Sequence, residues 1–497
     1  MVMTNSATKK QKQANSDLTQ GSIWKTIVRF SLPILLSYLL QNFYSVADAA
    51  ICGYTLSASE VAGVNDTNSI SFIFLQFAFG CTAGMSVILS TRIGRNDSDG
   101  VRKALATQIV LSFFIVVAVT VISLFTINPL LALLGVTPSD TSEVNNAVYN
   151  AAFTYISIIC GGMIGQFAYN LICCVLRSLG NSVTPLIFLV ISTALNIALD
   201  LVFIMACGWG VAGAAAATVI SQLLSAIACF IFTFVRYKEL RLKLADFKAM
   251  DMRTSLRTLW QGIPLGLQFS VLSFGILTMS NGVISFDKTA NGAMVAGTPA
   301  QIGYSAACKL DNIFFTPFNA LGTAMISFTG QNNGAGKHDR IRRGIMQTML
   351  IMLVISAIEI TAGLLLSVNG MYQHFFLASD KINSETIRFG NTYLYSALPF
   401  AFVLGVLLVL RNVIQGLGKP LFPFLAGIAE LIARIVICIF LPLLANGGPI
   451  NSSASSLSFF CLGLGDAVAW FAAAILLAIA TVYYMRKLSN QTPQSIT

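Results

Sequence analysis

The sequence predicts an all-α polytopic membrane protein, with twelve transmembrane helices in two parallel-repeat six-helix bundles. Hydrophobic residues make up 56% of the 497 positions and charged residues only 10%, whereas soluble proteins carry roughly 25% charged residues. Apolar runs of about 20 residues, long enough to cross a hydrocarbon core of ~30 Å, recur along the chain. They lack the alternating apolar and polar residues of barrel strands. Because only helices or closed barrels satisfy the hydrogen bonds of the backbone in lipid, the spans are expected to be helices.

The apolar runs define twelve expected spans, and the long basic loop near the middle of the chain divides them into two sets of six. The expected spans are 26–52, 62–90, 104–127, 147–176, 184–206, 211–235, 258–285, 298–329, 344–368, 388–416, 421–445 and 459–485. The expected parts are a cytoplasmic tail (1–25), an N-terminal bundle (26–236), a linker (237–257), a C-terminal bundle (258–486) and a second cytoplasmic tail (487–497).

The charges of the loops predict the orientation in the membrane. Most of the 30 Lys and Arg residues fall in one alternate set of loops, and the opposite loops hold only Lys288, Lys381 and Arg388. By the positive-inside rule, both termini are cytoplasmic and the protein is a multi-pass protein of the inner (cytoplasmic) membrane. The net charge of +10 fits loops that face anionic membrane lipids, and no nucleic-acid partner is expected.

Two pairs of motifs relate the halves to one another. GRNDSDGVRK (94–103) aligns with GAGKHDRIRR (334–343), and LRSLGNSVTP (176–185) aligns with IQGLGKPLFP (414–423), so that the two pairs have nearly the same offset. Because six is an even number, each half enters the membrane in the same orientation. The two halves are therefore expected to form a parallel repeat, with a pathway between them.

The residues of common catalytic and metal sites are scarce. The ten cysteines are scattered, without a C-x-x-C pair, and the two histidines, His338 and His374, fall in loops. We expect no resident metal and no cofactor. No Walker motif is present, so ATP is not the expected energy source, and no convergent nucleophile or base indicates an enzyme.

Ionisable residues inside the spans are the strongest functional signal, because each costs ~2.5–3.5 kcal/mol on insertion scales. Some of them pair, others carry function, and the sequence alone leaves several roles open. The candidates are Asp48, Asp200, Lys309, Asp311, Glu359, Arg411, Glu430, Arg434 and Asp466.

Two aspartates are the first candidates for a coupling site. Gln41, Tyr44 and Asp48 follow one face of the first expected span, and Asn196 and Asp200 follow one face of the fifth. Both aspartates lie within about two turns of the outer end of their helices, and neither stripe carries a basic residue. Two carboxylates in one low-dielectric site disfavour joint ionisation, so we expect proton binding; Na⁺, which prefers oxygen ligands, is the rival.

The other ionisable residues suggest structural roles. Glu430 and Arg434 have the i,i+4 spacing of a helical ion pair. Lys309 and Asp311, two residues apart, cannot face each other and are expected to meet other helices or line a central cavity. Arg411 lies close enough to the inner face to extend its charge into the interface.

The segment DLTQGSIWKTIVRFSLPILLSYLLQNFYSVADAAI (17–51) resembles the opening of MATE-family multidrug exporters, in the DinF-like branch. The resemblance continues in order through 79–105, through RSLGNSVTPLIFLVISTALNIALDLVFIMACGWGVAGAAAAT (177–218) and through FNALGTAMISFTGQNNGAG (318–336). It implies two six-helix bundles, export of organic cations, coupling to H⁺ or Na⁺, and a monomer.

The resemblance points to Asp48 and Asp200 for the coupling ion, with Asn196 and Asn170 as hydrogen-bonding partners. It matches Pro33 to the family proline that permits bending of the first helix. Some relatives use acids on the seventh and tenth helices for a cation site. This sequence has no acid within either span: Asp287 lies at the outer edge of the seventh, and Asp466 keeps a cation site in the C-terminal half open. Aromatic, amide and thioether side chains suit apolar cations. The residues expected along the substrate pathway are Gln41, Tyr44, Gln268, Met279 and Tyr395.

These features favour a secondary active exporter of organic, cationic and aromatic compounds, driven by H⁺ or Na⁺ antiport, with alternating access between the bundles. Its expected partners are a small-molecule substrate and membrane lipids. The alternative is a flippase for a lipid-linked or glycan precursor, which would need a basic central cavity; Lys309 and Arg411 are the residues that could supply it.

Overall fold

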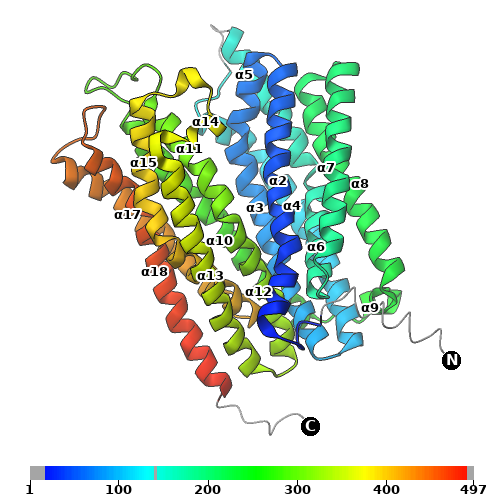
Figure 1. Ribbon diagram of the computed structural model, residues 1–497. Coiled ribbons are helices and arrows are strands. Elements are labelled where there is room, and N and C mark those ends of the chain that lie inside the picture. The colour runs from blue at the N-terminus through cyan, green and yellow to red at the C-terminus, as the bar shows by residue number, and fades with distance from the viewer. Residues whose placement is uncertain (1–16, 139–142, 490–497) are drawn as a thin grey trace. The chain divides into compact units, whose positions relative to one another are not determined.

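The fold was analysed in a computed structural model of the chain (Figure 1), which describes residues 17–138 and 143–489. Every regular element of these residues is a helix. Most of the expected N-terminal tail and the end of the C-terminal tail lie outside the described residues.

The first half of the chain holds α2 to α8, followed by two short helices in the expected linker. The bounds are α2 Ile23–Thr55, α3 Ala58–Gly94, α4 Ser98–Leu133, α5 Glu143–Gly161, α6 Met163–Ser178, α7 Val183–Asp200, the π-helix η1 Leu201–Ala206, α8 Gly210–Arg236, η2 Lys238–Leu240 and α9 Leu244–Lys248.

The second half holds α10 to α18, with three short 3₁₀ helices between them. The bounds are α10 Met252–Ser285, α11 Pro299–Phe314, α12 Thr316–Gly334, α13 His338–Ser367, η3 Val368–Gly370, α14 Gln373–Phe376, η4 Ser379–Lys381, α15 Ser384–Ala397, η5 Leu398–Phe400, α16 Ala401–Gly416, α17 Leu421–Asn446 and α18 Ser456–Ser489.

Among the described residues, ten helical segments are long and apolar enough to cross a membrane, and the bent pair α5–α6, with a 44° angle at its break, makes an eleventh. The pair α11–α12 occupies the eighth expected span, although polar side chains lower its hydropathy. The structure thus interrupts three spans that the sequence presents as continuous. They are α5–α6, α11–α12 and α15–α16, the last interrupted by the 3₁₀ turn η5. Two of the breaks, at Gly162 and at Phe400, fall at equivalent places of the repeat, with the same offset as the second pair of aligned motifs.

The backbone also repeats where helices end. Asn96 and Gly336 occupy equivalent positions in the first pair of motifs, and both have positive φ. Gly180 and Gly418, which are equivalent in the second pair, also both have positive φ. Positive φ is uncommon outside glycine. The two aligned motif pairs therefore encode the same backbone turns after α3 and α12, and after α6 and α16.

The described chain falls into two compact units. Unit 1 contains most of α2, then α3 to α9, the first half of α10 and the end of α12. Unit 2 contains the second half of α10, α11, the start of α12 and α13 to α18. Within the described residues, the ranges are 17–21, 28–138, 143–270 and 327–337 for unit 1, and 22–27, 271–326 and 338–489 for unit 2.

Large apolar side chains cover the outer faces of the helices in both units. Phe125 is 83% exposed and Leu444 is 77% exposed, while Leu105 and Val409 are fully buried. Exposed apolar surface of this extent is unfavourable in water but suits contact with lipid chains.

Glycines bring the ends of α3 and α12 into backbone contact within unit 1. A Cβ atom at Gly94 would lie 2.0 Å from the carbonyl oxygen of Gln331, and one at Gly334 would lie 2.1 Å from that of Thr91. Only glycine permits so close an approach, which is the usual role of small residues at helix crossings in membranes.

The segment before α2 packs against the same end of α12. Leu18 is fully buried, and its backbone N–H donates to Oε1 of Gln331 (3.2 Å). Nδ2 of Asn332 donates to the carbonyl oxygen of Leu18 (3.1 Å), and Nε2 of Gln331 donates to that of Ser178 at the end of α6 (2.7 Å). The resembling DLTQG segment is thus part of the packing of unit 1.

Candidate functional site

Helix α2 presents its polar stripe toward α7 and α8. Tyr44 and Asp48 are one turn apart and therefore share a face of the helix. Pro33 lies inside α2, N-terminal to both, and its carbonyl oxygen accepts a hydrogen bond from Oγ of Ser37 (2.8 Å). A proline removes a backbone N–H from a helix and favours bending there.

Thr218 on α8 connects α2 with α7. The hydroxyl groups of Tyr44 and Thr218 lie 3.4 Å apart, and Nδ2 of Asn196 donates to the same Thr218 Oγ1 (3.4 Å). Helices α2, α7 and α8 therefore meet at one polar point.

Asp48 and Asp200 belong to this cluster. The negative charge of Asp48 acts on Asp200, and both charges act on the hydroxyl groups of Tyr44 and of Tyr155 from α5. Asp200 is fully buried, whereas Asp48 is half-buried. Oδ1 of Asp48 is buried without a hydrogen-bond donor among the described residues, so it is open to a proton or a cation.

The backbone changes its geometry directly after Asp200. The last residue of α7 is followed by the π-helix η1, Leu201–Ala206, in which Phe203 stacks on Trp209 with ring centroids 4.8 Å apart. Single π-turns are rare overall, and many of those known lie at functional sites. The sequence does not reveal this turn, because side-chain periodicity hardly differs between an α-helix and one turn of π-helix.

The other expected site residues lie in varied surroundings. Gln41 is exposed on α2. Tyr395 is 43% exposed, and its hydroxyl lies 3.0 Å from Oγ of Ser367. Gln268 and Met279 of α10 are buried inside units 1 and 2 respectively. Nδ2 of Asn170 on α6 is buried without an acceptor among the described residues.

The oxygen atoms of this cluster could bind a small cation. Asp48 and Asp200 supply carboxylate oxygens, and Asn196 and Thr218 supply an amide and a hydroxyl oxygen, which suit Na⁺ as well as H⁺. Across residues 17–138 and 143–489, no group of three or more His, Cys, Asp or Glu side chains is placed to hold a metal ion.

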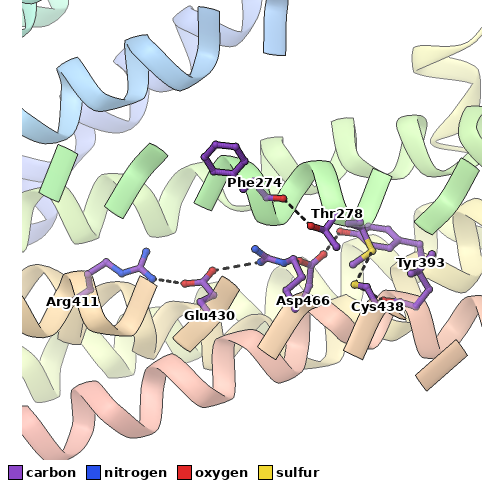
Figure 2. Close-up of polar contacts among 10 residues, drawn as sticks. Phe274, Thr278, Tyr393, Arg411, Glu430, Cys438 and Asp466 are labelled. Carbon is purple, nitrogen blue, oxygen red and sulfur yellow. Dashed lines mark hydrogen bonds and ion pairs between the residues drawn. The ribbon is translucent and has the colours of Figure 1, made fainter. Parts of the chain in front are cut away.

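Unit 2 contains a chain of buried charges (Figure 2). Nη2 of Arg411 donates to Oε2 of Glu430 (2.6 Å), and Oε1 of Glu430 lies 3.5 Å from Nη2 of Arg434. Nε of Arg434 donates to Oδ1 of Asp466 (2.8 Å), whose Oδ2 accepts from the hydroxyl of Tyr393 (2.9 Å). Two arginines and two acids from α16, α17 and α18 thus neutralise one another.

This network changes two expectations from the sequence. Arg411 does not reach toward the membrane interface: that expectation is wrong, because its side chain is 6% exposed and turned inward to Glu430. The i,i+4 contact between Glu430 and Arg434 is present, but as the longest link of a larger network. A Cβ atom at Gly275 of α10 would lie 2.5 Å from Nη1 of Arg434, so this glycine gives the guanidinium group its space.

Asp287, two residues after the end of α10, caps a helix. Its Oδ1 accepts from the backbone N–H of Ala300 and its Oδ2 from that of Gln301, both at 2.9 Å. These residues belong to the first turn of α11, whose free N–H groups and helix dipole favour a carboxylate there. Lys309, on the same helix, is exposed, whereas Asp311 is buried.

Comparisons with known proteins identify the family. The family model MatE matches residues 33–202 and 293–440. The chain is 30% identical over 408 residues to "Probable multidrug resistance protein YpnP" of Bacillus subtilis, covering 82% of this chain and 85% of the relative. It is 21% identical to an "FAD transporter" of Shewanella oneidensis, covering 87% and 90%.

A solved structure has the same fold. A transporter of the MOP superfamily from Pyrococcus furiosus matches with a TM-score of 0.81 at 20% identity, covering 96% of this chain and 99% of that one. Such neighbours have the twelve-helix fold of MATE transporters, so the expected fold class is confirmed. The chain is a multi-pass membrane transporter of small molecules, not an enzyme, and it belongs to the MATE family of multidrug efflux transporters.

Proposed function

We propose that this transporter exports organic cations in exchange for H⁺ or Na⁺, with the coupling ion held by Asp48 and Asp200. The observation that carries the proposal is that Asp48 of α2 and Asp200 of α7 lie close enough to interact electrostatically, beside Tyr44 and Asn196, which Thr218 joins. An acid pair without a basic residue on either stripe suits a site that binds and releases a cation.

Antiport follows from competition for negative charge. With the acids ionised, the site attracts an organic cation; when H⁺ or Na⁺ binds, the negative charge falls and the attraction is lost. A transporter needs this difference in binding free energy between its states. Pro33 of α2 and the π-helix after Asp200 are the backbone features that would let the two acid-bearing helices change shape.

The relatives and the side chains support an apolar, cationic substrate. YpnP is described as a probable multidrug resistance protein. Exposed Gln41 and Tyr395, with Tyr44, offer amide and aromatic groups for planar cations. The relative described as an FAD transporter carries an anion instead. Here, however, Arg411 and Arg434 are neutralised by acids, which argues against a basic cavity for FAD or a lipid-linked precursor.

Five further points belong to the same proposal. The two halves alternate access to the two sides of the membrane, and the protein works as a monomer in the cytoplasmic membrane. The basic loops favour a cytoplasmic location for both termini. The motif 17–51 supports membership of the DinF-like branch.

The test is ethidium efflux from proteoliposomes, driven separately by a pH jump and by a Na⁺ jump. We expect one of the jumps to drive efflux and Asp48→Asn to lower the driven rate at least about tenfold. Asp99→Asn removes an exposed acid at the start of α4 and is the control. An Asp48→Asn protein that exports as well as the parent would refute the coupling role.

A further inference from the structure

Two acids of unit 2 remain outside its ion network. Asp311 on α11 is 3% exposed and Glu359 on α13 is 5% exposed. All four of their carboxylate oxygens are buried and have no hydrogen-bond donor among the described residues. Tyr393 lies beside Asp311, but its single hydroxyl proton is donated to Oδ2 of Asp466 (2.9 Å).

The neighbouring acids differ in having cationic partners. Glu430 is bound by two arginines, and Asp466 by one arginine and one tyrosine. An ionised carboxylate that is buried without such partners is strongly unfavourable, because nothing replaces its hydration. The same group costs far less as a neutral acid, so an unpartnered buried carboxyl group takes up a proton.

The surroundings of the pair contain other acids and hydroxyl groups. The charge of Asp466, from α18, acts on Asp311, and the charge of Asp311 acts on Glu359. Arg434 of α17 is turned to Asp466 and Glu430, and Lys309 of α11 is exposed. The remaining titratable groups that Asp311 influences are Cys308 of α11, Tyr372 before α14 and Tyr393 of α15.

The two helices are in contact close to these acids. A Cβ atom at Gly363, one turn after Glu359, would lie 3.3 Å from the ring of Phe314, which follows Asp311 by three residues. On α11, Asp311 shares a face with Cys308 and Tyr304, at spacings of three and four. The pair therefore lies inside unit 2, between α11, α13, α15 and α18.

We propose that Asp311 and Glu359 form a second proton-binding site, in unit 2, that loads and releases protons in the transport cycle. Each carboxylate takes up one H⁺ and returns it, with no other bond made or broken. Because ionising one acid makes ionising the other more costly, the protons leave in two steps. The role in the cycle rests on the proposed antiport; the protonation of the two acids at rest does not.

Infrared difference spectroscopy of the protein in lipid tests the protonation directly. At neutral pH, the parent is expected to show carbonyl bands of protonated carboxylic acids. Asp311→Asn and Glu359→Gln should each remove one band, whereas Asp99→Asn, at an exposed acid, should remove none. Spectra of both buried-site variants that match the parent in this region would overturn the proposal. An alkaline titration of the parent protein, which needs no variant, should abolish the same bands.

The role in transport is tested by counting protons per ethidium exported. With Asp48 and Asp200 intact, the variant carrying both Asp311→Asn and Glu359→Gln should still export, with a proton count roughly twofold lower. An unchanged count would overturn the role of the second site. A failure of the proposed function looks different: Asp48→Asn would then leave driven export unchanged, while the infrared bands of Asp311 and Glu359 would persist.

Discussion

Glu430 holds two buried guanidinium groups, those of Arg411 and Arg434, and its loss would leave both without their shared acid. Removing one partner of a buried ion network costs about 3–5 kcal/mol, because an uncompensated charge remains in a low-dielectric site. We expect Glu430→Gln to lower the apparent melting temperature of the purified transporter strongly.

A double variant separates the effect of charge on stability from the effect of packing. Replacing Arg411 and Glu430 together by Met removes one charge of each sign and keeps apolar volume in place. This double variant is expected to be more stable than Glu430→Gln alone. If thermal unfolding in detergent ranks the two variants the other way, the network does not act by charge compensation.

Asp97 provides a pH-dependent contribution outside the membrane-spanning segments. The backbone N–H of Gly100 (2.8 Å), followed by the guanidinium group of Arg92 (2.7 Å), lowers the pKa of its carboxyl group. A lowered folded-state pKa stabilises the protein above the unfolded pKa of about 3.9, and the gain is lost as the pH falls through the folded value.

Asp97→Asn keeps a good N-cap for α4 but removes the charge. Because the side chain is 35% exposed, we expect a loss of less than about 1 kcal/mol at neutral pH. The difference from the parent should vanish in acid. Melting curves at several pH values test this, and a difference that grows on acidification would contradict it.

Sequence spacing places Tyr44 and Asp48 on one face of α2, and Asn196 and Asp200 on one face of α7, because a helical stripe fixes which residues share a face. It could not identify the partner of Arg411, since Glu430 lies on another helix. The sequence also does not show that the carboxyl groups of Asp311 and Glu359 lack hydrogen-bond donors among the described residues. Whether a buried acid has a partner depends on packing between helices, which no local pattern encodes.

At the scale of elements, hydropathy predicts where the chain crosses the membrane but not where a helix breaks. The breaks at Gly162 and Phe400 lie inside runs that are apolar on both sides. Composition averages over such a run and therefore reports one span. The repeat supplies the missing information, because equivalent breaks recur at matching positions of the two halves.

Close contact between α3 and α12 depends on individual glycines, and this can be tested at one position. A Cβ at Gly94 would lie 2.0 Å from a carbonyl oxygen of α12, so Gly94→Ala forces the two helices apart. Overpacking of this kind costs about 1–3 kcal/mol or more. We expect a lower yield of folded protein and a lower melting temperature.

The matched control is Gly161→Ala at the end of α5, where a Cβ would meet nothing within 4 Å. Its effect should be neutral or slightly stabilising, since alanine favours helix. Equal effects of the two substitutions would show that the contact at Gly94 does not limit packing.

At the scale of the whole chain, the N-terminal segment is held by residues from the second half of the sequence. The side chain of Gln331 makes two hydrogen bonds: its Oε1 accepts from the Leu18 N–H (3.2 Å), and its Nε2 donates to the Ser178 carbonyl oxygen (2.7 Å). Gln331 comes from the second sequence repeat, yet α12 ends in unit 1 together with α3 and α6. The helices of a sequence repeat therefore do not pack only with one another, although a basic loop divides the sequence near its middle.

Gln331→Leu tests this long-range link. It removes the side chain that bonds the Ser178 carbonyl oxygen and the Leu18 N–H, and the loss of a buried hydrogen-bonding partner costs about 1–3 kcal/mol. Lys337→Met is the comparison, because the two bonds from Lys337 Nζ to Thr19 are exposed and contribute little. Limited proteolysis at the N-terminus should become faster in Gln331→Leu and stay near the parental rate in Lys337→Met. Equal protection of both variants would mean that the burial of Leu18 alone holds the segment.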